Sequence, residues 1–247
     1  YMAGAHGAFA VMAVLRHRRR TGEGQLIEIP QAETASSMLA PAFMEYALNG
    51  EVPRNVGNRS IYGFSPYNTY PCHSPGDGGD GGDRWISIAV TSDDEWTALR
   101  AIMGEPDWAQ SADFDTAAGR IAREDLLDEG ISEWTRPQDD YALFHLLQNA
   151  GIAAAPVLEA SRLFDDAHVK ARGLNQSQIL QDDVGSFLFN APFYRFSETP
   201  IGIDKPPVAL GEDNEYVYKE VIGLSQAEYD ALLESGQAGL DFDDSIR

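Results

Sequence analysis

The stretch that most constrains the fold is residues 11–33, VMAVLRHRRRTGEGQLIEIPQAE. Small and apolar residues occupy almost every face of the helix expected over residues 4–19, which is typical of a helix buried in the layer beside a parallel sheet. Basic residues complement the negative end of its dipole, and Gly22 and Gly24 end it. The apolar run Leu26–Ile29 then predicts a buried strand. This order of elements predicts an α/β fold.

The rest of the chain predicts a glycine-rich middle flanked by helices and short strands. Residues 31–49 predict one long helix, which Pro41 kinks. Residues 50–83 are rich in Gly, Pro, Asn and Ser, which indicates a domain boundary and a loop. Strands are expected at 84–90, at 151–158 and twice within 174–200, and helices at 93–103, 116–134, 138–149, 160–168, 213–222 and 225–235.

The charge of the chain excludes one class of partner. It carries 39 acidic and 18 basic residues, a net charge of −21, whereas nucleic-acid binding rests on Lys and Arg. No apolar run approaches the roughly 18–20 residues of a membrane span. The single cysteine, Cys72, cannot form an internal disulfide, and the N-terminus is not of the signal type. We therefore expect a cytoplasmic protein that binds neither nucleic acid nor membrane.

The run GDGGDGGD at residues 76–83 has the most unusual composition in the chain. Alternating Asp and Gly resemble a calcium-binding nonapeptide repeat, but such repeats stack in several copies and this one occurs once. A surface insertion is the plainer interpretation. The functional interpretation is a loop whose backbone N–H groups approach a ligand or an oxyanion. The glycines of that loop are Gly76, Gly78, Gly79, Gly81 and Gly82.

Other signatures of chemistry are weak. No histidine stands at ligand spacing with a second His or Cys, so no metal site is predicted. The chain contains no G-x-S-x-G, Walker loop or dinucleotide fingerprint. Arg18, Arg19 and Arg20 offer a phosphate or CoA contact, although a solvated basic helix end is the commoner explanation. The residues alone predict an acidic α/β protein with a ligand-accessible middle.

Several stretches, in order, resemble the family III CoA-transferases, of the CaiB/BaiF type. This group includes formyl-CoA transferase and carnitine CoA-transferase and shares its fold with α-methylacyl-CoA racemase. The most specific stretch is R-x-x-TGEGQ at Arg18–Gln25, which IEIPQAE follows. The others are Ala3-Gly4 with the helix to Arg20, RNVGN at 54–58, YPC at 70–72, DRWISIAV at 83–90, EWT at 133–135, AGIAAAPV at 150–157, PPVALGE at 206–212 and IGLSQAEYDALLESG at 222–236.

The resemblance implies part of a Rossmann-like large domain and a smaller α+β domain, arranged in an interlocked dimer. By that reading, residues 1–50 are the end of the large CoA-binding domain with a linker helix. Residues 51–189 are a linker and the small domain with the glycine-rich loop. Residues 190–247 return to the large domain. The resemblance covers the C-terminal two-thirds of the family pattern, so we expect a fragment, found as a homodimer or with its missing N-terminal half.

The family's chemistry is the exchange of CoA between an acyl-CoA and a small free carboxylic acid. A nucleophilic Asp forms an acyl anhydride and then an enzyme-CoA thioester. CoA is thus a substrate, and no permanently bound cofactor is implied. In the pattern D-x-x-A-G, the Asp would stand immediately before Tyr1, so this chain alone is expected to be inactive. The resemblance also implies that the glycine loop contacts the thioester intermediate.

Two alternatives stay open at this point. The same fold supports racemisation of an acyl-CoA, which uses a general acid and base in place of a nucleophile. The second alternative is a non-catalytic partner subunit that supports an active homologue, because the Asp is not in the chain. Neither the acyl group nor the acceptor acid can be identified from the sequence.

Overall fold

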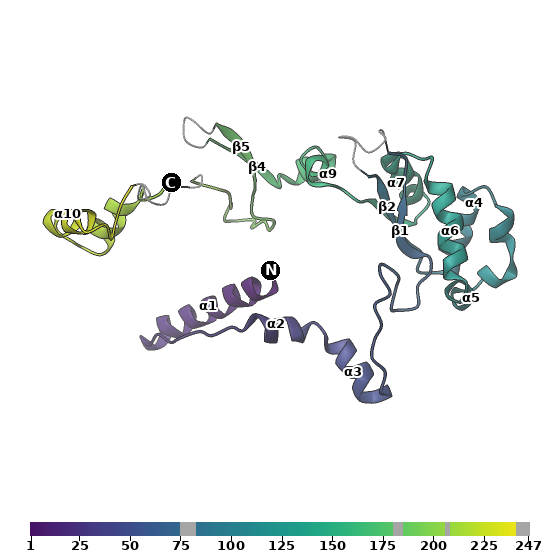
Figure 1. The fold of residues 1–247 in the computed structure, drawn as a ribbon, viewed down its shortest axis with the longest axis horizontal. Helices are drawn as coiled ribbons and strands as arrows, with labels where there is room; N and C mark the ends of the chain where they lie inside the picture. Colours follow the sequence, from purple (N-terminus) through teal and green to yellow (C-terminus); the bar gives the residue numbers. More distant parts are fainter. Residues whose placement is uncertain (75–82, 180–184, 206–207, 241–247) are drawn as a thin grey trace. The chain divides into compact units, whose positions relative to one another are not determined.

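The structure is a computed structural model, drawn in Figure 1, and it describes residues 1–74, 83–179, 185–205 and 208–240. Contacts between Cα atoms divide the chain into two units, residues 1–73 with 85–155 and residues 74–84 with 156–247. This division concerns contacts within one chain. The predicted domain boundaries after residues 50 and 189 therefore stay predictions.

The first helix, α1 (Met2–Thr21), covers and slightly exceeds its predicted range. It ends at Gly22, whose φ of 81° places it in the left-handed region that favours glycine. The N–H of Gly22 donates to the carbonyl of Arg18 and so satisfies a carbonyl that has no partner inside the helix. The predicted end of this helix is therefore confirmed.

The prediction that this helix is buried on most sides is wrong for the described chain. No residue of α1 is buried, and Phe9 and Met12 are well exposed. The small residues of α1 do permit a close approach. Ile29, for example, lies 3.7 Å from the position that a Cβ on Gly7 would occupy. A helix with apolar residues on every face requires packing partners on every face. Among the described residues, only a short segment that includes Ile29 packs against α1.

Two further predictions for this region are wrong. Residues Leu26–Ile29 form no strand, because a strand requires a neighbour to pair with and none of the described strands pairs with them. The single helix expected over 31–49 is two helices, α2 (Gln31–Ser37) and α3 (Ala40–Asn49). Pro41 stands in the first turn of α3, where its missing N–H costs no hydrogen bond, so it begins a helix.

A three-stranded sheet in the order β1-β2-β3 organises the first unit. The strands are β1 (Tyr67–Pro71), β2 (Trp85–Ala89) and β3 (Ala153–Pro156). Strands β1 and β2 are antiparallel, with Tyr67 opposite Ala89 and Pro71 opposite Trp85. Strands β2 and β3 confirm the predicted strands there. Strand β1 lies within residues 50–83, so the prediction of an unbroken loop is wrong at this point.

Helices cover this sheet and complete the core of the unit (Figure 1). They are α4 (Asp93–Ile102), α5 (Ala117–Ala122), α6 (Glu124–Thr135) and α7 (Asp140–Asn149), with two short 3₁₀ turns at Asp107–Gln110 and Ala112–Phe114. The alternation of β2 buries Ile86 and Ile88 fully. They pack in one cluster with Trp96 of α4, Ile131 of α6 and Leu147 of α7.

The second unit contains a hairpin of β4 (Asn175–Ile179) and β5 (Ser186–Asn190), as predicted for residues 174–200. Its helices are α8 (Ala160–Leu163), α9 (Ala167–Arg172), the π-helix η3 (Tyr216–Val221) and α10 (Gln226–Glu234). Helix α10 begins at a capping box of Ser225 and Glu228. No helix in the described part of the chain has both the length and the apolar character for crossing a membrane.

Candidate functional site

The site residues predicted from the sequence form two sets, and the structure describes one of them. Three of them are exposed in the last turn of α1, where they form a basic helix end, and these are Arg18, Arg19 and Arg20. The glycines of the predicted loop lie outside the described residues, and these are Gly76, Gly78, Gly79, Gly81 and Gly82. Within the ranges that the structure describes, no three His, Cys, Asp or Glu side chains gather as a metal site requires.

The best-defined candidate element is the segment of residues 57–66, which begins with the last two residues of RNVGN and leads into β1. We call it the anchored segment, because arginine side chains hold it at both ends. Gly57 and Gly63 have φ values of 68° and 81°, which residues with a Cβ rarely adopt. Glycine at these two positions therefore permits the path that the segment follows.

The first anchor is Arg59, which pairs with the first turns of α6. Its Nη2 lies 2.8 Å from Oδ2 of Asp128 and 2.6 Å from Oδ1 of Asp125. Asp128 also accepts hydrogen bonds from the Tyr70 hydroxyl at 2.7 Å and from the Asn68 amide at 2.9 Å. One carboxylate thus connects the anchored segment to β1 and α6.

Burial and charge set the protonation of this network. Burial, followed by the Asp128 carboxylate, raises the pKa of Tyr70, so its phenol stays protonated and donates. Hydrogen bonds to Asp125 and Asp128 raise the pKa of Arg59, which stays a cation. Burial also raises the pKa of Glu124, while Arg59 opposes that shift from 3.5 Å away. The attraction of Arg59 therefore only partly offsets the cost of ionising the Glu124 carboxyl in a buried position.

The second anchor is Arg120 of α5, which is only 1% exposed. Its guanidinium donates to the carbonyl of Ser65 at 2.6 Å and to the carbonyl of Phe114 at 3.0 Å. It also pairs with Asp93 at 2.8 Å and lies 5.7 Å from the ring centroid of Trp96. A buried cation with all these partners fixes the end of the anchored segment to the core.

Between the two anchors, Ile61 and Tyr62 are 65% and 73% exposed. A segment with fixed ends and exposed apolar side chains is a preorganised contact surface, because little conformational entropy is lost when it meets a ligand. Neither anchor is among the residues predicted from the sequence. Arg120 stands in AAGRIA, which carries no signal of a buried cation, and the acidic partners of Arg59 lie more than sixty residues away in the chain.

Cys72 is a poor candidate for a nucleophile. It is buried, and burial together with the carboxylates of Asp140 and Asp139 raises the pKa of its thiol to about 11. The reactive form of cysteine is the thiolate, which is scarce near neutral pH at such a pKa.

The raised pKa of Glu124 predicts a pH-dependent effect of Glu124→Gln. The folded protein holds the Glu124 proton to a higher pH than the unfolded chain, so wild-type stability falls as pH rises from the ordinary Glu range through the folded pKa. Gln cannot ionise, so the variant does not lose stability in this way as pH rises. The free energy of unfolding of Glu124→Gln, relative to wild type, should therefore increase with pH. Urea denaturation between about pH 4 and pH 8 measures it, and the opposite slope would mean that Arg59 outweighs burial.

Comparison with known proteins adds a family and several relatives. Residues 1–214 match the family described as CoA-transferase family III. The succinyl-CoA:mesaconate CoA-transferase of Haloarcula marismortui is 33% identical over 165 residues, which are 67% of this chain and 38% of that protein. The beta subunit of the succinyl-CoA–L-malate CoA-transferase of Chloroflexus aurantiacus is 30% identical over 237 residues, 94% of this chain and 55% of that subunit. The chain thus spans about half, or less, of the length of these relatives.

A solved structure supports the same grouping. The crystal structure of a CAIB/BAIF family protein from Brucella suis matches with a TM-score of 0.72 and 26% sequence identity. The match covers 89% of this chain and 54% of that one. The α/β fold that the sequence predicts is confirmed, whereas the interlocked dimer stays a prediction.

Proposed function

The chain belongs to CoA-transferase family III, and on that premise we propose that it serves the transfer of CoA from an acyl-CoA to a free carboxylic acid. The observation that carries the proposal is the family match over residues 1–214. By their names, two relatives use succinyl-CoA as the donor, and their acceptors, mesaconate and L-malate, are small dicarboxylates. We propose the same classes here, a succinyl-type thioester as donor and a small dicarboxylic acid as acceptor.

The proposed reaction proceeds through a carboxylate nucleophile, which we place immediately before Tyr1. Its oxygen attacks the thioester carbonyl, the C–S bond breaks, and CoA leaves as a thiolate with an acyl anhydride behind it. The thiolate then attacks the Asp carbonyl of the anhydride, which releases the donor acid and leaves an enzyme-CoA thioester. The acceptor carboxylate repeats the two steps in reverse order. Electron pairs balance without an oxidant, and no proton is consumed.

The residues of this chain have supporting roles in the proposal. The guanidinium groups of Arg18, Arg19 and Arg20 are suited to phosphate groups of CoA. The glycine loop of residues 76–82 would present backbone N–H groups to the intermediate. The anchored segment supplies a fixed contact surface, and its exposed Tyr62 is available to the acyl or acceptor group. We further propose a homodimer, or an assembly with an N-terminal half, in the cytosol.

The test is a CoA-exchange assay on the full-length gene product. Succinyl-CoA is incubated with mesaconate, with L-malate or with acetate as a monocarboxylate control, and thioesters are separated by chromatography. We expect a new CoA thioester with a dicarboxylate, no accumulation of free CoA, and a hydroxylamine-sensitive enzyme-CoA adduct. Hydrolysis alone would contradict the proposal.

Two other outcomes of this test would support the alternatives. Deuterium exchange from solvent next to the thioester, without transfer of CoA, would indicate a racemase. Activity that appears only after a homologous subunit is added would indicate a supporting subunit.

A further inference from the structure

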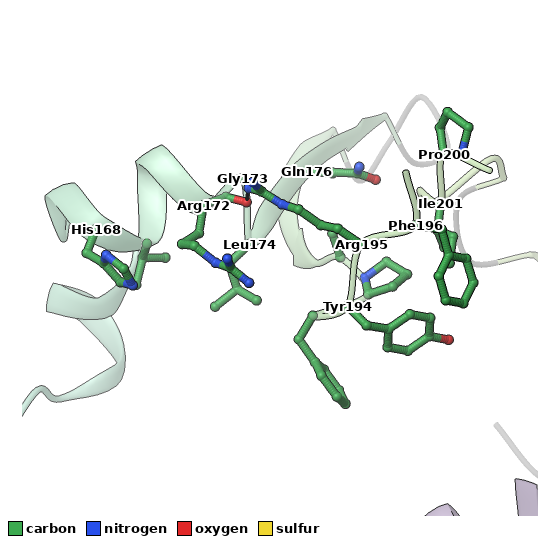
Figure 2. Close-up of a pocket in the computed structure, with 14 residues that line it drawn as sticks. His168, Arg172, Gly173, Leu174, Gln176, Tyr194, Arg195, Phe196, Pro200 and Ile201 are labelled. Atoms are coloured by element: carbon green, nitrogen blue, oxygen red, sulfur yellow. Dashed lines mark hydrogen bonds between the residues drawn. The ribbon is translucent and has the colours of Figure 1, made fainter. Parts of the chain in front are cut away.

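The second unit contains a pocket of about 420 Å³ that none of the assigned roles uses. It lies between the end of α9, the start of β4 and the segment after β5 (Figure 2). We call it the basic–aromatic pocket. Its volume is within the range of about 300–1,000 Å³ that is typical of small-molecule sites. Its main lining side chains are His168, Arg172, Gln176, Tyr194, Arg195 and Phe196.

The walls of this pocket are fixed by hydrogen bonds outside the β-ladder. The N–H of Ala191 donates to the carbonyl of Leu174 at 2.6 Å, and the N–H of Ile203 donates to Oε1 of Gln176 at 2.8 Å. These bonds hold the segment after β5 against the start of β4, and three of the four residues that form them line the pocket. The pocket is thus a structural feature of this unit, formed by residues distant in sequence.

The charge of the pocket is opposite to that of the chain. No Asp or Glu is among its lining residues, although the whole sequence has a net charge of −21. The guanidinium of Arg195 donates to the backbone carbonyl of Arg172, so it lies beside the end of α9, from which the Arg172 side chain also extends (Figure 2). Among the described residues, neither arginine side chain forms an ion pair. Two exposed arginines that have no ion pair within the described ranges, in an acidic protein, favour an anionic ligand.

The other wall is aromatic. The ring centroids of Phe193 and Tyr194 are 5.7 Å apart, and those of Tyr194 and Phe196 are 5.5 Å apart. About half or more of each of these side chains is exposed. Exposed aromatic faces stack well on planar rings, and guanidinium groups bind phosphate oxygens in a bidentate manner. A purely apolar ligand would leave the arginines without partners, and a small dicarboxylate would leave the rings without contacts.

We propose that the basic–aromatic pocket binds a phosphorylated nucleotide, with its phosphate on Arg172 and Arg195 and its base against Tyr194 and Phe196. This inference is independent of the proposed CoA transfer, because it concerns binding alone. Two kinds of ligand carry such a phosphate and base, a free nucleotide and the nucleotide end of a CoA thioester. Only the second source rests on the proposed function.

The test is calorimetric titration of the full-length protein with adenosine 3′,5′-bisphosphate and with ADP. We expect saturable binding of at least one of them, tighter than that of inorganic phosphate or of adenosine, and weaker at high salt. Arg172→Gln and Arg195→Gln should each raise Kd about ten- to a hundredfold, because each removes a charge-assisted contact. Arg136→Ala, an exposed arginine of the other unit, is the matched control and should leave Kd unchanged.

Competition with CoA identifies the source. If CoA displaces the nucleotide, and the arginine variants raise KM for acyl-CoA but leave kcat unchanged, the ligand is the nucleotide end of CoA. Binding that CoA does not displace assigns the pocket to a free nucleotide. The proposal is overturned if neither nucleotide binds saturably, or if the folded double variant Arg172→Gln/Arg195→Gln binds as wild type. Circular dichroism establishes that each variant is folded, and no turnover is required, so failure of CoA transfer would be seen separately.

Discussion

Arg120→Ala is expected to lower the free energy of unfolding by about 3–5 kcal/mol, the usual cost of removing one partner from a buried charged network. The substitution leaves the carbonyls of Ser65 and Phe114 without their donor, and it opens a cavity beside Trp96. Urea denaturation followed by tryptophan fluorescence measures the change, since Trp96 reports directly on this part of the core.

The matched control is Arg123→Ala on the neighbouring turn. Arg123 is also paired with a carboxylate, that of Asp113, but its side chain is 52% exposed. An exposed ion pair contributes about 1 kcal/mol or less. The two variants therefore make the same chemical change in two environments. If Arg120→Ala were no more costly than Arg123→Ala, the hydrogen bonds of Arg120 would not anchor the segment of residues 57–66.

Elements with local determinants could be predicted from the sequence. Ser92 accepts a hydrogen bond from the N–H of Glu95 at the start of α4, and Ser225 forms a capping box with Glu228 at the start of α10. The alternation in β2 likewise depends on neighbouring residues alone. In each case the signal and its structural consequence lie within a few residues, so the element was predicted with the right type and nearly the right bounds.

Elements that depend on distant partners could not be predicted in the same way. Strand β1 has the sequence YNTYP, whose polar composition is typical of a loop. The side chains of Asn68 and Tyr70 donate hydrogen bonds to Asp128, which is distant in the sequence, so their role in the strand could not be predicted. Leu26–Ile29 has the composition of a buried strand but lacks a partner among the described strands. The pattern of apolar residues predicts which residues need to be packed or paired in a sheet. It does not predict whether a packing partner or a neighbouring strand is present.

The candidate site follows the same division. The sequence identified residues that stand in a recognisable local motif. These are the arginines beside the TGEGQ stretch and the glycines of residues 76–82. The structure adds Arg59 and Arg120, which belong to no recognisable sequence motif. Their role depends on hydrogen bonds to carboxylates and carbonyls that are distant in the sequence. The family resemblance remains the reason to connect either set with CoA.

Asp128→Ala is expected to lower the free energy of unfolding by about 2–4 kcal/mol. Its carboxylate accepts from Arg59, Asn68 and Tyr70, and the side chain is only 15% exposed. Without it, the hydroxyl of Tyr70, a residue that is 1% exposed, loses its only hydrogen-bond partner among the described residues. An unsatisfied buried donor costs more than the hydrogen bond itself contributed, because water cannot replace the lost partner.

Asp125→Ala is the matched comparison, because Asp125 pairs with the same arginine through a shorter contact of 2.6 Å. Its side chain is 94% exposed, so water competes for both partners and a loss of less than about 1 kcal/mol is expected. Double-mutant cycles with Arg59→Ala should give a coupling energy of about 1 kcal/mol or more for Asp128 and close to zero for Asp125. Equal coupling for the two aspartates would mean that contact distance, and not burial, decides how firmly the anchored segment is held.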